Sequence, residues 1–139
     1  MQKTAKNAIF TRGASAIDLW GVGKDGTTLH VIELKCGDNK GMGVISETLF
    51  YAGILYDTCI RADDLFQFGT YRGTLETSDK RAIMNNGKKF RRLAVHVLAE
   101  KYHPLFSEAV VQLIRQGFST FPVDFDRAGY NFEEKVITP

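Results

Sequence analysis

The stretch SAIDLWGVGKDGTTLHVIELK, residues 15–35, decides the fold because it contains two short apolar runs around a turn signal. The runs are residues 15–22 and 28–35, and Asp25-Gly26 lies between them. An Asp-Gly pair in this position predicts a β-hairpin, since both central positions of a type I′ turn need a positive φ. Pairing that is symmetric about this turn places Asp18 opposite Glu33.

The hairpin brings two carboxylates and a lysine together. Directly opposed residues on one face of a sheet have Cβ atoms about 4.5 to 5.5 Å apart, and two like charges at that separation favour a cation between them. Because side chains alternate along a strand, Glu33 and Lys35 share one face. Ile32 and Leu34 are expected to point to the other face, toward a core.

Carboxylate oxygens are the ligands that Mg²⁺ and Mn²⁺ prefer. Beside such an ion, Lys35 could orient a bound water, act as its base, or stabilise negative charge on a phosphate. The residues alone leave these three roles open. The alternative interpretation is a solvated sheet face, on which Lys35 is an ordinary surface ion-pair partner.

The rest of the chain predicts one α/β domain over residues 1–139, which could also be one module of a longer protein. The amphipathic spacing and turn signals predict, in order, a helix over 44–60, a strand over 65–75, a turn at 85–87, a strand over 93–99, a helix over 104–116 and a strand over 118–125. Pro104 suits the first turn of the second helix, and Gly117 is its expected end.

The composition limits the functional classes. A chain with 44% hydrophobic residues can bury a core, and a net charge of +2 is too small for the whole surface to attract a polyanion. Cys36 and Cys59 lack the spacing of a zinc site or a disulfide framework. The N-terminal residues do not form a signal peptide, and there is no membrane-spanning run, so a cytoplasmic protein without a membrane partner is expected.

Basic residues provide the candidate contacts to nucleic acid. The stretch from Lys80 to Arg92 contains six of the eighteen lysines and arginines, and two further cations flank the acidic pair. The candidate phosphate contacts are Arg12, Lys40, Lys88, Lys89, Arg91 and Arg92. The alternative for such a stretch is a solvated polar loop.

The three histidines give no zinc-site spacing. His30 is expected on the hairpin face opposite Glu33, so it is not expected to join a metal site there. His96 lies in an apolar strand and is expected to be a core residue, and His103 is expected in a loop.

Ile17-Asp18, followed after fourteen residues by Glu33-Leu34-Lys35, resembles the PD-(D/E)xK motif of the restriction-endonuclease-like nuclease superfamily. Ile17 stands where the motif name has proline. Residues 47–51 resemble the Gln-x-x-x-Tyr helix motif of the RecB-like branch, with Glu47 in place of glutamine and Tyr51 in the tyrosine position. The resemblance covers residues 12–57.

This resemblance implies a central mixed β-sheet flanked by helices and an Mg²⁺-dependent deoxyribonuclease, with Mn²⁺ also supporting activity. It implies metal binding by Asp18, Glu33 and the backbone carbonyl of Leu34, catalysis by Lys35, and a contribution from Glu47 and Tyr51. It also implies that two copies pair as a homodimer when both DNA strands are cut.

The chain departs from the family pattern at one point, because residues 1–17 contain no acidic side chain where many members carry a further glutamate. Either that ligand is absent, or Glu47 replaces it, or the chain is a piece of a longer protein. The departure supports an alternative, a non-catalytic nucleic-acid- or protein-binding module that keeps the fold. A glycosidase built on paired carboxylates is a further alternative, but Lys35 fits a phosphate better than a sugar.

Overall fold

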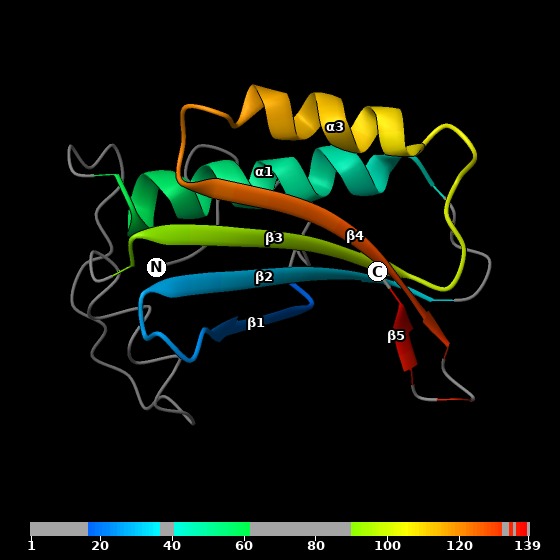
Figure 1. Ribbon diagram of the computed structural model, residues 1–139, viewed down its shortest axis with the longest axis horizontal. Coiled ribbons are helices and arrows are strands. Elements are labelled where there is room, and N and C mark those ends of the chain that lie inside the picture. Colours follow the sequence, from blue (N-terminus) through cyan, green and yellow to red (C-terminus); the bar gives the residue numbers. More distant parts are fainter. Residues whose placement is uncertain (1–16, 37–40, 62–89, 132–133, 135, 139) are drawn as a thin grey trace, which may run out of the picture.

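The computed structural model describes residues 17–36, 41–61, 90–131, 134 and 136–138. These residues form an α/β structure with one mixed sheet and two helices (Figure 1). In chain order the elements are β1 (Leu19–Val22), β2 (Thr28–Lys35), α1 (Gly43–Cys59), β3 (Arg92–Ala99), α3 (Glu108–Gly117), β4 (Val123–Asn131) and β5 (Val136–Thr138). The predicted strand over 65–75 and the turn at 85–87 lie outside the described residues.

The sheet has the strand order β1-β2-β3-β4-β5, which follows the chain. The outer pairs, β1 with β2 and β4 with β5, are antiparallel, whereas β2, β3 and β4 run parallel to one another. Parallel neighbours need a crossover connection, and α1 and α3 lie in these two connections. Because β2 and β3 are parallel, their carboxyl ends lie side by side at the same end of the sheet, where Lys35 pairs with Ala99.

The hairpin has the predicted register, with Leu19 opposite Ile32 and Val22 opposite Leu29. Its turn differs from the expected two-residue form. The Gly23 N–H donates to the Thr28 carbonyl at 2.8 Å, so four residues, 24–27, form the loop. A loop of four residues has the same centre as the expected loop of two, which is why the register survives.

The loop is stabilised by its own aspartate. One oxygen of Asp25 accepts the N–H groups of Thr27 and Thr28, each at 2.9 Å, and the other accepts the Thr28 hydroxyl at 2.6 Å. These bonds favour the ionised form and hold the pKa of Asp25 well below its ordinary value, with the Thr28 hydroxyl contributing most. Gly26 supplies the left-handed residue of the loop, with φ of +68°.

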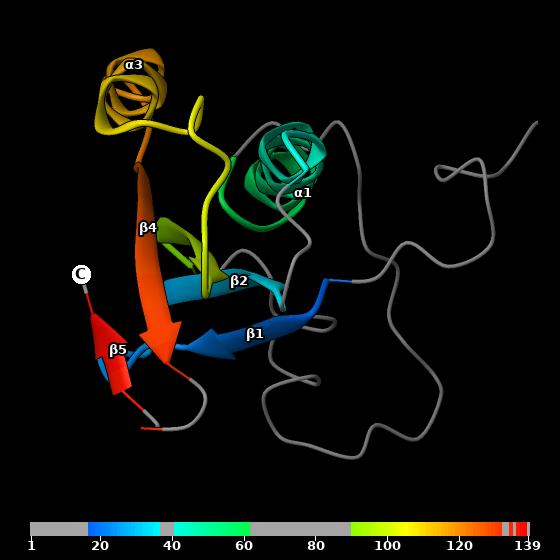
Figure 2. The ribbon, with the colours of Figure 1, turned by 90° about the vertical axis from the view of Figure 1, so that its right-hand side faces the viewer.

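Both described helices lie on the same face of the mixed sheet (Figure 2). The core lies between this face and the helices, and it contains Leu29 and Val31 of β2. Since side chains alternate, Glu33 points to the same side. The expectation that Ile32 and Leu34 face a core is therefore wrong, because both are only half-buried and lie outside that cluster.

The helix predicted over 44–60 is confirmed as α1, and the strand predicted over 93–99 as β3. The second helix starts later than predicted. Pro104 lies in a tight turn, in which the Phe106 N–H donates to the His103 carbonyl at 2.8 Å, and α3 begins at Glu108 after the extended Ser107.

The last predicted strand, over 118–125, is also displaced. The chain turns again after α3, since the Phe121 N–H donates to the Phe118 carbonyl at 2.8 Å, and β4 begins only at Val123. The short strand β5 was not predicted. Neither of the helices described is long and apolar enough to cross a lipid bilayer.

Candidate active site

The candidate site lies where β2 ends and α1 begins to cover the sheet. Glu33 and Lys35 project from the last three residues of β2 toward the helix layer, and Glu47 projects from the first part of α1. The Lys35 ammonium donates to Glu33 Oε1 at 2.6 Å and to Glu47 Oε2 at 3.2 Å. One lysine therefore bridges a strand carboxylate and a helix carboxylate.

Glu33 is buried in a way that is unusual for a carboxylate. Its residue surface is 2% exposed, and it shares its side of β2 with Leu29 and Val31. Among the described residues, the Glu33 Oε2 atom has no hydrogen-bond partner. Burial raises the pKa of Glu33, although the hydrogen bond from Lys35 acts in the opposite direction. A buried acceptor without a donor costs free energy, so this oxygen is a candidate ligand atom.

Lys35 is more buried than a surface lysine, since only 16% of its side chain is exposed. Burial on its own would lower the pKa of Lys35, but the hydrogen bonds to Glu33 and then Glu47 outweigh burial, and the pKa is raised. Glu47 is the solvent-exposed partner of Lys35, with 43% of its side chain exposed. The ammonium is thus fixed by two acids but remains next to solvent.

Asp18 joins the site through the backbone of β2. Its Oδ2 atom accepts the Leu34 N–H at 2.9 Å, one position beyond the first ladder pair of β1. The charge of Asp18 is close enough to raise the pKa of Glu33, as a lesser contribution after burial. In an extended strand the N–H and C=O of one residue project to the same edge, so the Leu34 carbonyl also faces the Asp18 side.

The oxygen donors at this edge match the chemistry of a hard divalent cation. Mg²⁺ is usually bound by one or two carboxylates and completes its shell with water and phosphate oxygens. Asp18, Glu33 and the Leu34 carbonyl provide such a set, and the unpartnered Oε2 of Glu33 provides a free acceptor. Across residues 17–36, 41–61 and 90–131, no three acidic, histidine or cysteine side chains already converge as a metal cluster. The donors therefore fit Mg²⁺ only with exogenous oxygen ligands.

Lys35 contacts both Glu33 and Glu47, and Asp18 lies directly before the neighbouring strand β1. No family model, curated protein or solved structure matches this chain. The interpretation of the site therefore depends on its own geometry and chemistry.

Tyr51 lies one helical turn after Glu47 and is 3% exposed. Residues four apart share a helix face, and Tyr51 lies at the border of that face with the buried side of α1, which also carries Thr48 and Leu55. Its ring lies 6.0 Å from that of Phe50, measured between centroids.

The proposed nucleic-acid contacts fall into two groups. Arg12, Lys40, Lys88 and Lys89 lie outside the described residues. Arg92 is described and stands at the start of β3, opposite Thr28, whereas Lys35 stands at the far end of the same ladder. The ladder advances by seven residues between Arg92 and the pair formed by Lys35 and Ala99, so the two ends are about 23 Å apart.

Arg92 also has a local partner, because its guanidinium contacts Asp124 at 3.2 Å. Arg91 precedes β3, and its N–H donates to the Thr27 carbonyl at 2.8 Å. The structure therefore does not bring Arg91 and Arg92 to the acidic site.

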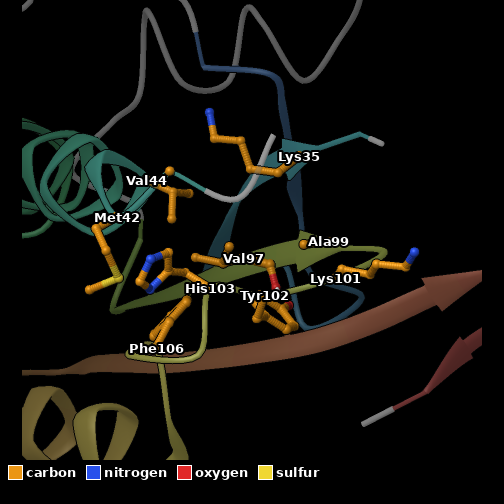
Figure 3. Close-up of a pocket in the computed structure, with 10 residues that line it drawn as sticks. Lys35, Met42, Val44, Val97, Ala99, Lys101, Tyr102, His103 and Phe106 are labelled. Atoms are coloured by element: carbon orange, nitrogen blue, oxygen red, sulfur yellow. Dashed lines mark hydrogen bonds between the residues drawn. The ribbon is translucent and has the colours of Figure 1, made fainter. Parts of the chain in front are cut away.

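A narrow pocket lies beside the stem of Lys35, under the start of α1 (Figure 3). Its walls are formed by Lys35, Gly41, Met42, Val44, Val97, Ala99, Lys101, Tyr102, His103 and Phe106. In Figure 3 the His103 ring lies between Met42 and Phe106, and Lys101 extends away from it. The cavity volume is about 10 Å³, roughly the room for one water. The pocket is therefore too small for a nucleotide base.

Sequence reasoning did not identify this pocket wall. His103 was expected only as a loop residue, and Tyr102 carried no motif. The Tyr102 hydroxyl lies 2.7 Å from the Val97 carbonyl and 2.6 Å from the Ala128 carbonyl, so it links β3 and β4 near the site. The only available signal was their position directly after β3, where loops at the carboxyl ends of parallel strands gather.

Proposed function

We propose that this protein is a divalent-metal-dependent phosphodiesterase that hydrolyses DNA, built on a restriction-endonuclease-like variant of the α/β fold. The observation that supports this most is Glu33, a buried carboxylate whose second oxygen has no partner within the described part of the chain, beside a lysine and across from a second carboxylate. A cation that bridges Glu33 and a substrate phosphate would satisfy that oxygen.

In this proposal Asp18, Glu33 and the Leu34 carbonyl hold Mg²⁺ or Mn²⁺. When bound, such an ion polarises a phosphoryl group and lowers the pKa of a coordinated water. The backbone N–H of Leu34 fixes the Asp18 carboxylate at 2.9 Å, so this ligand is oriented before any ion arrives. Burial fixes the Glu33 side chain in the same way. Preorganisation of this kind removes the cost of ordering ligands on binding.

Lys35 is proposed to contact the phosphate. An ammonium group has three N–H donors, and the bonds to Glu33 and Glu47 use two of them. The third can donate to a non-bridging phosphate oxygen, where it would stabilise the negative charge that develops in the transition state. Glu47 positions the ammonium from the solvent side, and Tyr51 supports the helix face that carries Glu47.

A second candidate is a non-catalytic module that binds nucleic acid or protein. The ion pair between Lys35 and Glu33 favours it, because a lysine at 2.6 Å already compensates the buried charge without any metal. This candidate predicts binding without cleavage, and in that case Lys35 would be a structural residue.

The test is cleavage of end-labelled single-stranded and duplex DNA by purified full-length protein with Mg²⁺, with Mn²⁺ and with EDTA. We expect cleavage only with a metal, and its loss in Lys35→Met and in Asp18→Asn while the circular dichroism spectrum is unchanged. Lys24→Met is the matched control, because Lys24 lies in the hairpin loop at the other end of β2. Cleavage in EDTA, or full activity of Lys35→Met, would overturn the proposal, and metal-independent binding alone would support the second candidate.

A further inference from the structure

Two histidines meet on the sheet face that points away from the helices. His30 of β2 and His96 of β3 lie on adjacent parallel strands, and His30 Nδ1 is 3.2 Å from His96 Nε2. The two rings are nearly parallel, at 10°, with centroids 5.5 Å apart. Both side chains are half-buried, so the pair is in contact with solvent. No role in the proposed catalytic site uses them.

The separation of these two nitrogens matches that of neighbouring metal ligands. Imidazole nitrogens bind zinc at about 2.0 to 2.1 Å, so two ligands at right or tetrahedral angles stand about 2.9 to 3.4 Å apart. The observed 3.2 Å lies within this range. Without a metal, one ring must donate an N–H to the other, and a metal ion would take the place of that proton.

The backbone beside His30 leaves space for its ring. A Cβ atom at Gly23 would lie 3.2 Å from His30 Nε2 and 2.9 Å from Asp25 Oδ1. Gly23 therefore leaves room for the His30 ring and for the Asp25 carboxylate, both of which lie near this position.

The surroundings of His96 are similar. Asp126 is its direct neighbour on β4, and Asp124 lies on the same strand face. Each of these acids is in an ion pair at the sheet edge: Arg92 contacts Asp124 at 3.2 Å, and Arg115 contacts Asp126 at 2.8 Å. His96 and these two ion pairs line one broad groove. An ion bound by His96 would therefore face a polar and open surface.

We propose that His30 and His96 form a two-histidine site for a borderline divalent transition metal such as Zn²⁺ or Ni²⁺. Imidazole ligands prefer these ions, whereas Mg²⁺ prefers oxygen. Two histidines supply half of a four-coordinate shell, and water supplies the remainder, because the described residues contain no third side chain converging with them. A bound ion would connect β2 to β3 across the sheet and stabilise the fold, by an amount that rises with the logarithm of its concentration once the site is saturated.

This site is separate from the proposed Mg²⁺ site, since side chains alternate and Glu33 points to the opposite face from His30. The two proposals therefore fail independently. Loss of DNA cleavage would leave zinc binding unchanged, and loss of zinc binding would leave Mg²⁺-dependent cleavage unchanged.

The first test is calorimetric titration of tag-free, full-length protein with Zn²⁺ and with Ni²⁺ at neutral pH. We expect one ion per chain for the wild type, and binding weaker by at least about tenfold in His30→Gln and in His96→Gln, since losing even a second-shell partner has an effect of that size. His103→Gln is the matched control, because its Nδ1 accepts the Leu105 N–H in a loop outside this face. Equal affinity in all four proteins, or no binding by the wild type, would overturn the proposal.

The second test needs no variant and so does not depend on the folding of one. Side-chain ¹⁵N spectra of the wild type, recorded with and without Zn²⁺, report each histidine separately. We expect the Nδ1 signal of His30 and the Nε2 signal of His96 to shift on addition of one equivalent, while the signals of His103 stay in place. A shift of His103, or no shift of the pair, would contradict the site.

Discussion

The Lys35 ammonium lies 2.6 Å from Glu33 Oε1, and this contact brings a cation to a carboxylate that is almost completely buried. The pair belongs to one strand and follows from side-chain alternation. What makes it unusual is the depth of Glu33, whose second oxygen has no donor among the residues described. An ordinary surface ion pair has both charges in contact with water, whereas here the carboxylate is buried.

Removing the cation should destabilise the fold. We expect Lys35→Met to lower the free energy of unfolding by about 2 to 4 kcal/mol, because the buried charge of Glu33 loses its ion-pair partner. In a Glu33→Gln background the same change should have an effect below about 1 kcal/mol, since the buried charge is gone. Urea titrations of the four proteins measure this coupling, and additive effects would contradict it.

Acid should weaken the fold through His96. Its pKa is lowered from the ordinary 6.5, mainly by burial and then by repulsion from His30, against the attraction of Asp126 and Asp124. The unfolded chain therefore binds a proton that the folded chain resists, so stability is highest above the unfolded pKa and falls as the pH drops through the folded pKa.

Unfolding free energies measured in EDTA from about pH 7 to pH 5 should show this decline for the wild type. His96→Gln should flatten it. His103→Gln should retain the full slope, and an equal slope in both variants would contradict the assignment to His96.

Two glycines of the hairpin should respond oppositely to alanine. Gly26 has φ of +68°, so Gly26→Ala should cost about 1 to 2 kcal/mol. Gly21 lies in β1, and a Cβ there would meet no atom within 4 Å, so Gly21→Ala should cause no loss. Thermal unfolding of the two variants decides this, and an equal loss in both would show that the loop conformation differs.

Replacing Arg92 should have little effect on the rate of DNA cleavage. It contacts Asp124 and stands about 23 Å from Lys35 along the ladder, a separation of more than two Debye lengths in physiological salt. We expect Arg92→Gln to leave kcat and KM of DNA cleavage within about twofold of the wild type. A large rise in KM with an unchanged kcat would instead show that DNA reaches this end of the sheet.

The sequence predicted the hairpin best, because Asp25 and Gly26 are local turn signals and the strand pairing follows from their position. It could not select the core face of β2. Apolar residues occupy both faces, with Leu29 and Val31 on one and Ile32 and Leu34 on the other. Only the placement of α1 and α3 on one side decides which set is buried, and that is a tertiary effect.

The start of α3 shows a second limit. Proline suits both the first turn of a helix and the second position of a tight turn. Pro104 adopts the turn, and the helix begins four residues later at Glu108, after Ser107. Single-residue preferences did not separate the two outcomes.

The candidate site was predictable in part. The closeness of Glu33 and Lys35 follows from alternation alone, but the contact of Glu47 with Lys35 depends on how α1 crosses the sheet. The pairing of His30 with His96 depends on β3 being the parallel neighbour of β2 in a particular register, which no local pattern reveals.

The most direct test of the proposed metal-dependent site is an anomalous difference map from crystals soaked in Mn²⁺. We expect one peak bounded by the Asp18 carboxylate, Glu33 Oε2 and the Leu34 carbonyl, and no peak there in Asp18→Asn crystals soaked in the same way. A fully soaked wild-type crystal with no density between those three groups would show that they do not bind a divalent metal.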